Sequence, residues 1–308
     1  MKLALGTVQF GLDYGVSNSA GQVNKLQVKE ILKSAHRAGI SVLDCASVYG
    51  NSEQVLGELE VSRQFSIVTK IPKLDSKTKS IIPLVKNSLN LLNVEHLEAV
   101  LFHHADDLLL HPKRKTFYRE LAEMKQQGVV NRVGASLYSP QQWQQLKKQY
   151  QLDLLQVPAN VLDQRFVSDR LFEDYQKHGV KIHCRSAFLQ GLLLMPATER
   201  PQYFKPYQAT LEKFDQLAIT LACSPLTLCL ALFDMLARQI KANPKIDDNT
   251  IEQIVVGCCS HAQLDEIVEA YHMSKQLPLS TQELTKKLSE LSSQAQALIN
   301  PSLWQITK

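Results

Sequence analysis

The sequence of 308 residues contains no continuous apolar stretch of about 18 residues, the length that a membrane-spanning helix needs. Its first residues, MKLALGTVQFG, hold one lysine and an apolar run too short for a secretory signal. The formal net charge is only +4 and the lysines are dispersed along the chain. We therefore expect no leader and no membrane association, and no nucleic-acid partner.

The cysteines show no pattern that predicts disulfide bonds. The chain has six cysteines but no CxxC pair, and the adjacent Cys258 and Cys259 are poorly suited to a disulfide. Free thiols in a reducing compartment are the simpler interpretation, so we expect a cytoplasmic protein. The GxGxxG fingerprint is absent as well, which removes the Rossmann type of dinucleotide site. We expect no metal site.

The sequence does contain a regular alternation of short apolar runs and longer helical patterns. Strands are predicted at 2–7, 40–44, 65–70, 97–103, 129–135, 153–157, 180–185 and 252–256. Helices are predicted at 25–38, 52–60, 79–92, 113–127, 140–149, 168–178, 207–222, 225–240 and 261–273. Gly39, Gly128 and Gly179 each precede a strand, as left-handed helix caps do. Buried strands separated by helices indicate parallel βα units.

This length and pattern predict the α/β class and one (β/α)8 TIM barrel, formed by residues 1–308 as a single domain. After the last βα unit, a helix is predicted at 280–293, where Ser280 and Glu283 have the spacing of a capping box. We expect this helix and the tail to Trp304 to cover one mouth of the barrel. Segment 194–206 is predicted to be a long loop.

Polar side chains follow three neighbouring predicted strands. Asp44 and Tyr49 follow the second strand, Lys70 ends the third, and His103 ends the fourth. In such barrels the active site lies where the strands end. When a carbonyl is reduced, negative charge builds on its oxygen and a proton must be supplied. Tyr49 could supply that proton if Lys70 stabilises its anion, with Asp44 orienting Lys70 and His103 donating to the substrate oxygen.

Taken one at a time, each of these residues has a structural explanation. A lone aspartate at a strand end is usually a cap, a lone lysine is usually solvated, and a buried histidine is usually a hydrogen-bonded core residue. The combination at three successive strand ends is harder to explain in that way.

Here the sequence resembles the aldo-keto reductase family over nearly its whole length. DCASVYGNSEQVLGE, beginning at Asp44, is similar to the family signature D-x-A-x-x-Y-G-x-S-E-x-x-L-G, and the TK and LFH strand endings also match. The resemblance implies that Tyr49 is the proton donor, that Lys70 and Asp44 modulate it, and that His103 orients the substrate. It also implies reduction of an aldehyde or ketone to an alcohol with NAD(P)H.

Further stretches resemble the cofactor-binding loops of that family. GVVNRVGAS ends in Ser136, QVPANVLD begins at Gln156, RSAFLQG resembles the pyrophosphate loop, and a last loop follows the eighth strand. The resemblance implies cofactor contacts from Ser136, Gln156, Arg185, Ser186, Phe188, Gln190, Gly191, Gly257, Gln263 and Glu266.

Three departures from the family pattern concern the cofactor. Leu137 replaces an asparagine, and Arg185 stands where an aromatic residue commonly stacks on the nicotinamide, although a guanidinium can also stack. The last loop lacks the basic pair that grips a 2′-phosphate. NADP(H) is therefore favoured only slightly, from family habit, and NAD(H) remains an option.

The substrate is expected to be a small-molecule carbonyl compound. LGTVQFGLDYGVSN and RSAFLQGLL look most like the branch of the family found beside bacterial surface-polysaccharide genes, which suggests a sugar or nucleotide-sugar carbonyl. Phe10, Tyr14, His104 and Tyr138 are candidates for the substrate pocket, with loop packing as the alternative. We expect a monomer or a weak homo-oligomer.

Two other functions stay open at this point. A cofactor-sensing regulatory barrel would bind nicotinamide without turnover, but it would not need the proton donor. An aldolase or lyase would use Lys70 as a Schiff-base amine, but Asp44 would keep that amine protonated.

Overall fold

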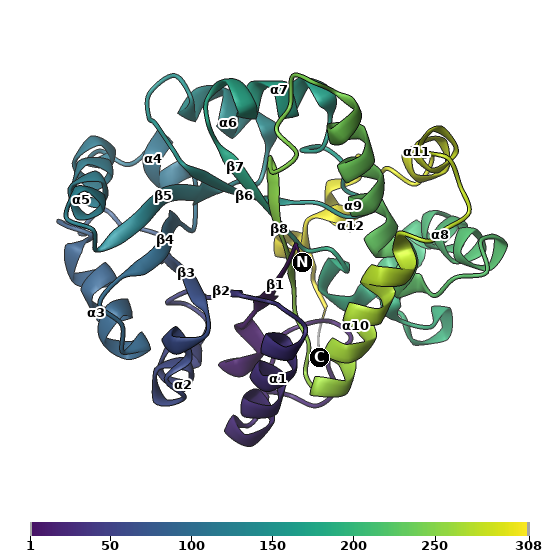
Figure 1. Ribbon diagram of the computed structural model, residues 1–308, viewed down its shortest axis with the longest axis horizontal. Coiled ribbons are helices and arrows are strands. Elements are labelled where there is room, and N and C mark those ends of the chain that lie inside the picture. Colours follow the sequence, from purple (N-terminus) through teal and green to yellow (C-terminus); the bar gives the residue numbers. More distant parts are fainter. Residues whose placement is uncertain (1, 307–308) are drawn as a thin grey trace.

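A closed barrel of eight parallel strands forms the centre of the computed structural model, which describes residues 2–306 (Figure 1). Each strand pairs with the next along the chain, and the first strand also pairs with the last. The strands are β1 Leu3–Gly6, β2 Val42–Asp44, β3 Ser66–Ile71, β4 Leu97–Phe102, β5 Val130–Ser136, β6 Leu154–Pro158, β7 Lys181–Arg185 and β8 Ile251–Val256.

The helices lie outside this ring of strands (Figure 1). They are α1 Lys25–Arg37, α2 Ser52–Glu58, α3 Ile82–Leu92, α4 Asp106–Leu109, α5 Arg114–Gln126, α6 Pro140–Leu146, α7 Asp169–Lys177, α8 Gln208–Thr220, α9 Pro225–Ala242, α10 His261–Ser274, α11 Thr281–Ser289 and α12 Gln296–Ile299. Within residues 2–306 no single helix is long and apolar enough to cross a membrane, and α9 with the helical segment 202–220 passes such a test only as a pair bent by 88°.

The predicted (β/α)8 TIM barrel is confirmed. All eight predicted strands are present with small shifts at their ends, and the three glycines before strands have positive φ angles, of 78°, 75° and 66°. The helices α4 and α12 were not predicted, because four residues are too few to show a helical period. Segment 194–206, predicted to be a loop, contains short 3-10 turns at 197–199 and 202–207.

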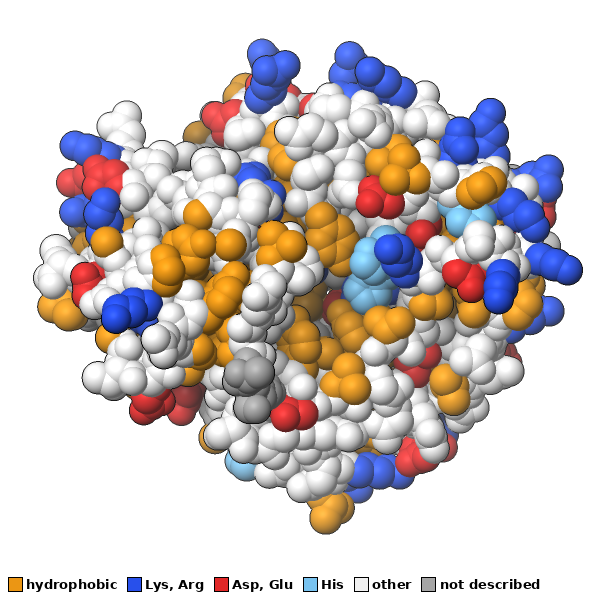
Figure 2. Space-filling model, turned by 180° about the vertical axis from the view of Figure 1, so that it is seen from behind, with side chains coloured by type: hydrophobic (Ala, Val, Ile, Leu, Met, Phe, Trp, Pro, Cys, Tyr) orange, Lys and Arg blue, Asp and Glu red, His pale blue; other side chains and the backbone are white. Residues whose placement is uncertain are grey.

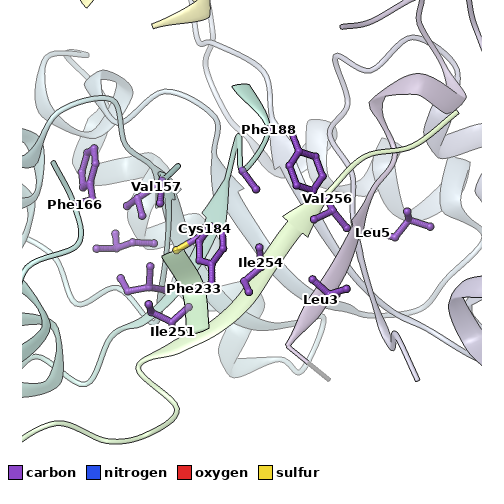
Figure 3. Close-up of a cluster of buried hydrophobic side chains, with 14 of the residues drawn as sticks. Leu3, Leu5, Val157, Phe166, Cys184, Phe188, Phe233, Ile251, Ile254 and Val256 are labelled. Atoms are coloured by element: carbon purple, nitrogen blue, oxygen red, sulfur yellow. The ribbon is translucent and has the colours of Figure 1, made fainter. Parts of the chain in front are cut away.

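Two apolar layers hold the barrel together. The larger lies between the strands and the helices, and Figure 3 shows part of it, with side chains of β1, β6, β7 and β8 and, beside those of β7 and β8, Phe233 of α9. The smaller fills the barrel interior and consists of Ala4, Val42, Val68, Ala99, Leu101, Leu154 and Val255. Side chains alternate along a strand, so Leu3 and Leu5 belong to the outer layer while Ala4 belongs to the inner one.

The C-terminal segment beyond β8 returns to the barrel. Ser280 and Glu283 form the predicted capping box at the start of α11. After α12, the ring of Trp304 packs edge-on against Phe204, with centroids 4.8 Å apart. None of the six cysteines, all of which lie within the described residues, is cross-linked in a disulfide.

Candidate active site

The alternation along the strands places the candidate residues inside the barrel, at the ends of its strands. Val42, Val68 and Leu154 point into the interior, and Asp44, Lys70 and Gln156 stand two positions later on the same strands. The same spacing relates His103 to the inward Leu101. Because parallel strands end at the same mouth, these polar side chains meet there.

Lys70 is at the centre of the polar network. Its side chain is 1% exposed, and its Nζ donates to Oδ2 of Asp44 at 2.7 Å and to the carbonyl oxygen of Cys45 at 2.8 Å. The hydroxyl oxygen of Tyr49 lies 3.5 Å from the same Nζ. An ammonium group has three donors, so two of them hold Lys70 in place and the third is directed at Tyr49.

The serine and glutamate of the YGNSE motif fix the loop that carries Tyr49. The hydroxyl of Ser52 donates to the carbonyl oxygen of Thr7 at 2.9 Å. The buried carboxylate of Glu53 accepts from the hydroxyl of Thr69 at 2.6 Å and from that of Ser88 at 3.2 Å. These bonds connect the start of α2 to the residue after β1, to β3 and to α3, so both residues are structural tethers.

The environment keeps Tyr49 as a neutral phenol. Burial, followed by the negative charge of Asp44, raises the pKa of Tyr49 well above its usual 10. The positive charge of Lys70 is largely balanced by Asp44 at 2.7 Å, which limits how far it can stabilise the tyrosine anion. The phenol therefore holds its proton until charge develops close to it.

His103 is neutral for a related reason. Burial, and then the positive charge of Lys70, lowers the pKa of His103 to about 3. Its ring meets the Tyr49 ring edge to face, with centroids 6.1 Å apart. A neutral imidazole can donate one N–H hydrogen bond without bringing a charge into the site.

These residues lie at a cavity of about 730 Å³. Asp44, Tyr49 and His103 line it, whereas Lys70 lies buried behind them. Figure 2 shows the face opposite to that of Figure 1, where histidine side chains lie beside a central hollow and apolar side chains surround it. Ser302 and its neighbours Asn300 and Pro301 also line the cavity, so the tail reaches the mouth as expected.

Most residues of the expected cofactor and substrate sets line the same cavity. They are Gln156, Arg185, Ser186, Phe188, Gln190, Gly191, Gly257, Gln263, Glu266, Tyr14 and Tyr138. Three expected residues do not line it. Ser136 is 1% exposed at the end of β5, Phe10 is fully buried in the outer core, and His104 stacks behind Tyr138. The apolar Phe10 ring is used for packing, which is the alternative that the sequence left open.

Several cavity residues were not predicted as site residues, among them Gln9 and Val48. Gln9 lies against Gly257, where an added Cβ would come within 2.8 Å of its Nε2. The buried Oε1 of Gln9 has no hydrogen-bond partner among the residues described. Loop positions such as these have no hydrophobic period, and Val48 occupies an unspecified position of the family signature, so sequence patterns could not assign them a role.

The sequence model of the aldo/keto reductase family matches residues 2–287. The chain belongs to the aldo/keto reductase family. A search of curated protein sequences returns no match.

Solved structures show the same fold. The chain is similar to the aldo-keto reductase AKR11C1 of Bacillus halodurans in its holo form, with a TM-score of 0.70, 19% identity, and coverage of 98% of this chain and 95% of that one. It is also similar to the glycerol dehydrogenase AKR11B4 of Gluconobacter oxydans, with a TM-score of 0.67, 21% identity, and coverage of 100% and 94%. Aldo-keto reductases are oxidoreductases that act on small-molecule carbonyl compounds with nicotinamide cofactors, and this chain is one of them.

Proposed function

We propose that this aldo-keto reductase reduces an aldehyde or ketone to an alcohol with NADPH or NADH, and that Tyr49 is its proton donor. The observation that carries the proposal is the 3.5 Å approach of the Tyr49 hydroxyl to Nζ of Lys70 at the wall of a deep cavity. The other two donors of Lys70 are already used, so this arrangement serves Tyr49.

The cavity suits a nicotinamide dinucleotide on structural grounds. Ser186, Leu189, Gln190 and Gly191 all have positive φ angles, and loops of this kind present backbone N–H groups to anions. Gly191 could not be replaced without conflict, since a Cβ there would lie 1.8 Å from Oγ of Ser17. The unpaired Oε1 of Gln9 offers one more acceptor at the cavity wall.

We assign the cofactor contacts to the residues named from the family pattern. Gln156 and Arg185 would lie near the nicotinamide, the 186–191 loop near the pyrophosphate, and Gly257, Gln263 and Glu266 near the adenosine. We also assign to Ser136 a contact with the carboxamide of the nicotinamide. Of the described residues that line the cavity, Arg185 is the only one with a full positive charge, so none of them offers a 2′-phosphate partner beside Glu266. We still favour NADPH slightly, because it is the usual cofactor of the family.

The chain's residues divide the reaction between them. When bound, the reduced nicotinamide supplies the hydride that the carbonyl carbon accepts. Tyr49 gives its hydroxyl proton to the carbonyl oxygen as negative charge develops there, and the third donor of Lys70 then stabilises the phenolate. Asp44 keeps Lys70 protonated and oriented, and neutral His103 donates a hydrogen bond to the same oxygen.

The geometry disfavours a Schiff base on Lys70. A nucleophilic amine needs a free lone pair, whereas Nζ of Lys70 is buried and donates to Asp44 and Cys45. We keep a sugar or nucleotide-sugar carbonyl as the proposed natural substrate, from the resemblance of the first and seventh loops. Location in the cytoplasm and a monomeric or weakly oligomeric state are likewise proposals from the sequence.

The test begins with fluorescence titration of NADPH and NADH. A panel of aldehydes, ketones and reducing sugars is then screened with the tighter cofactor. We expect turnover of some members, and a loss of about 10²–10⁴-fold in kcat/KM for Tyr49→Phe with cofactor Kd nearly unchanged. Tight cofactor binding with no turnover would favour the sensor, and equal activity of the variant would remove Tyr49 from its role.

A further inference from the structure

Arg185 is a partly buried cation at the end of β7 that no acid balances. Its Nη1 donates to Oγ of Ser186 and its Nη2 to the carbonyl oxygen of Leu137, both at 3.3 Å. Among the residues that the structure describes, no carboxylate forms an ion pair with it. Four other partly buried arginines do pair with a carboxylate, at 2.6–2.7 Å: Arg132, Arg165, Arg200 and Arg238.

A row of rings connects this cation to the proton donor. The guanidinium of Arg185 lies 4.8 Å from the centroid of the Tyr138 ring. Tyr138 stacks nearly parallel on His104 at 5.6 Å and 10°, and His104 stacks on His103 at 5.3 Å. His103 in turn meets Tyr49. Tyr49, where the substrate carbonyl is expected, and Arg185 therefore lie at the two ends of this row of rings.

The charges around the cavity leave Arg185 without compensation. Of the described lining residues, only Asp44, Arg185 and Glu266 carry a full charge. Asp44 is neutralised by Lys70 at 2.7 Å, and Glu266 belongs to α10, on the loop side assigned to adenosine. An unmatched cation in a partly buried site attracts an anion, and a guanidinium binds carboxylate or phosphate through two parallel hydrogen bonds.

We propose that Arg185, held over the Tyr138 ring, binds an anionic group of the substrate, so that the natural substrate is a carbonyl compound carrying a carboxylate or a phosphate. The inference rests on the proposed reductase function. A guanidinium has five N–H donors, and two are used by Ser186 and Leu137, so three remain at its edge. The face of the guanidinium opposite Tyr138 would make the nicotinamide contact proposed above.

The experiment uses pairs of substrates that differ only in the anion. The carboxylate arm compares 3-formylbenzoate and 4-formylbenzoate with their methyl esters, and the phosphate arm compares glyceraldehyde 3-phosphate with glyceraldehyde. With the native protein and saturating cofactor, we expect kcat/KM to favour the anion by about 10–100-fold in one arm at least, mainly through KM, the range of one charge-assisted pair. That arm identifies the group.

Variants at the two residues show whether Arg185 is responsible. Arg185→Met should bring the ratio of kcat/KM between the anionic and the neutral member to about one, because any loss of its nicotinamide contact affects both members equally and cancels in that ratio. Arg185→Lys should keep part of the preference. Tyr138→Leu, which leaves the charge but removes its support, should reduce the preference less. Cofactor Kd, measured by fluorescence for each variant, sets the cofactor concentration that saturates it, so that the two substrates are compared at equal cofactor occupancy.

Several results would overturn the proposal. One is equal kcat/KM for both members of every pair with the native protein. Another is an equal loss on both members in Arg185→Met together with weaker cofactor binding, because the charge would then serve the cofactor. If no aldehyde is reduced, the reductase function fails but the subsite can still be measured. Calorimetry of the cofactor-saturated protein should then show benzoate binding at least about tenfold tighter than benzamide, and Arg185→Met should remove the difference.

Discussion

Nε2 of Gln156 donates a 2.6 Å hydrogen bond to Oδ1 of Asp44, whose other oxygen holds Lys70 at 2.7 Å. Gln156 comes from β6, and Asp44 and Lys70 come from β2 and β3, so the bond crosses the barrel interior. The residue proposed to touch the nicotinamide carboxamide therefore also fixes the carboxylate that orients Lys70. Cofactor position and proton donation share one buried network.

The first prediction concerns this bond. Gln156→Glu would place a second carboxyl group within hydrogen-bond distance of Asp44, and repulsion between the two at such a separation would raise the pKa of one of them. One of them would hold a proton at low pH and lose it as the pH rises, weakening the Lys70 geometry. We expect kcat/KM of this variant to fall with rising pH in a range where the native enzyme is constant.

Gln156→Met is the matched control for that prediction. It removes the hydrogen bond without adding a titrating group, so its kcat/KM should be lower than native by about tenfold while its pH profile keeps the native shape. An unchanged profile for Gln156→Glu would show that the bond to Asp44 has no part in positioning Lys70.

The second prediction concerns pH and His103. Its pKa in the folded protein is lowered to about 3 from a usual value of 6.5, so the folded protein does not protonate it at pH 5–8. In the unfolded chain His103 takes up a proton below pH 6.5, which favours unfolding. The free energy of unfolding therefore decreases as the pH falls from about 6.5 towards 3. Activity on a neutral aldehyde should show no step near pH 6.5. His103→Gln should lose less Tm than the native protein between pH 7 and pH 4.5, and an equal loss would contradict the assignment.

The sequence predicted the architecture well because the barrel repeats one physical pattern. Each strand is buried on both faces and each connection is helical, so short apolar runs mark the strands even at 42–44, where β2 has only three residues. The four catalytic candidates were identified because they follow three consecutive strands. Their meeting then needs only the rule that parallel strands end at one mouth.

The rest of the site depends on contacts between distant loops. Gln9 and Ser302 line the same cavity although almost the whole chain separates them, and neither belongs to a periodic pattern. The protonation state of Tyr49 could not be inferred from the sequence either. The family pattern places Lys70 beside Tyr49. The pKa of Tyr49, however, depends on the close pairing of Lys70 with Asp44 and on the burial of the phenol. Distances of this kind are set by packing.

The third prediction concerns the loop after β7. Gly191 has a φ of 88°, and a Cβ at this position would lie 1.8 Å from Oγ of Ser17, on the loop after β1. Gly191→Ala would force the side chain of Ser17 to move at the cavity wall and would strain a backbone with positive φ, so we expect cofactor Kd to rise by about tenfold or more. Gly128→Ala is the control, since its φ of 75° is similar and nothing lies within 4 Å of the added carbon. That variant should lose about 1 kcal/mol of stability with native cofactor affinity, and equal effects of both changes on Kd would contradict the loop contact.

The fourth prediction concerns the opposite end of the barrel, where Glu252 of β8 holds two partners from other strands. Its carboxylate accepts from Nη1 of Arg132 at 2.6 Å and lies 3.0 Å from Nε2 of the fully buried His183. Burial by itself would raise the pKa of Glu252, but the hydrogen bonds from His183 and Arg132 outweigh it and lower the pKa to about 2. Because the folded pKa lies below the usual 4.5, the stabilisation is complete above pH 4.5 and is lost as the pH falls towards 2.

Glu252→Gln should therefore lower the free energy of unfolding at pH 7 by roughly 2–4 kcal/mol, because it leaves Arg132 without one of its two carboxylates at that end and His183 without its charged acceptor. The deficit should shrink as the pH is lowered, since the native carboxylate is then being protonated as well. Glu30→Gln is the control. Its ion pair with Lys33 spans 2.8 Å but both side chains are more than half exposed, at 53% and 55%, so its loss should leave the free energy of unfolding nearly unchanged. Urea unfolding of the three proteins at pH 7 and pH 4 measures both effects, and a cost for Glu252→Gln no larger than that for Glu30→Gln would show that the buried cluster adds no stability to the barrel.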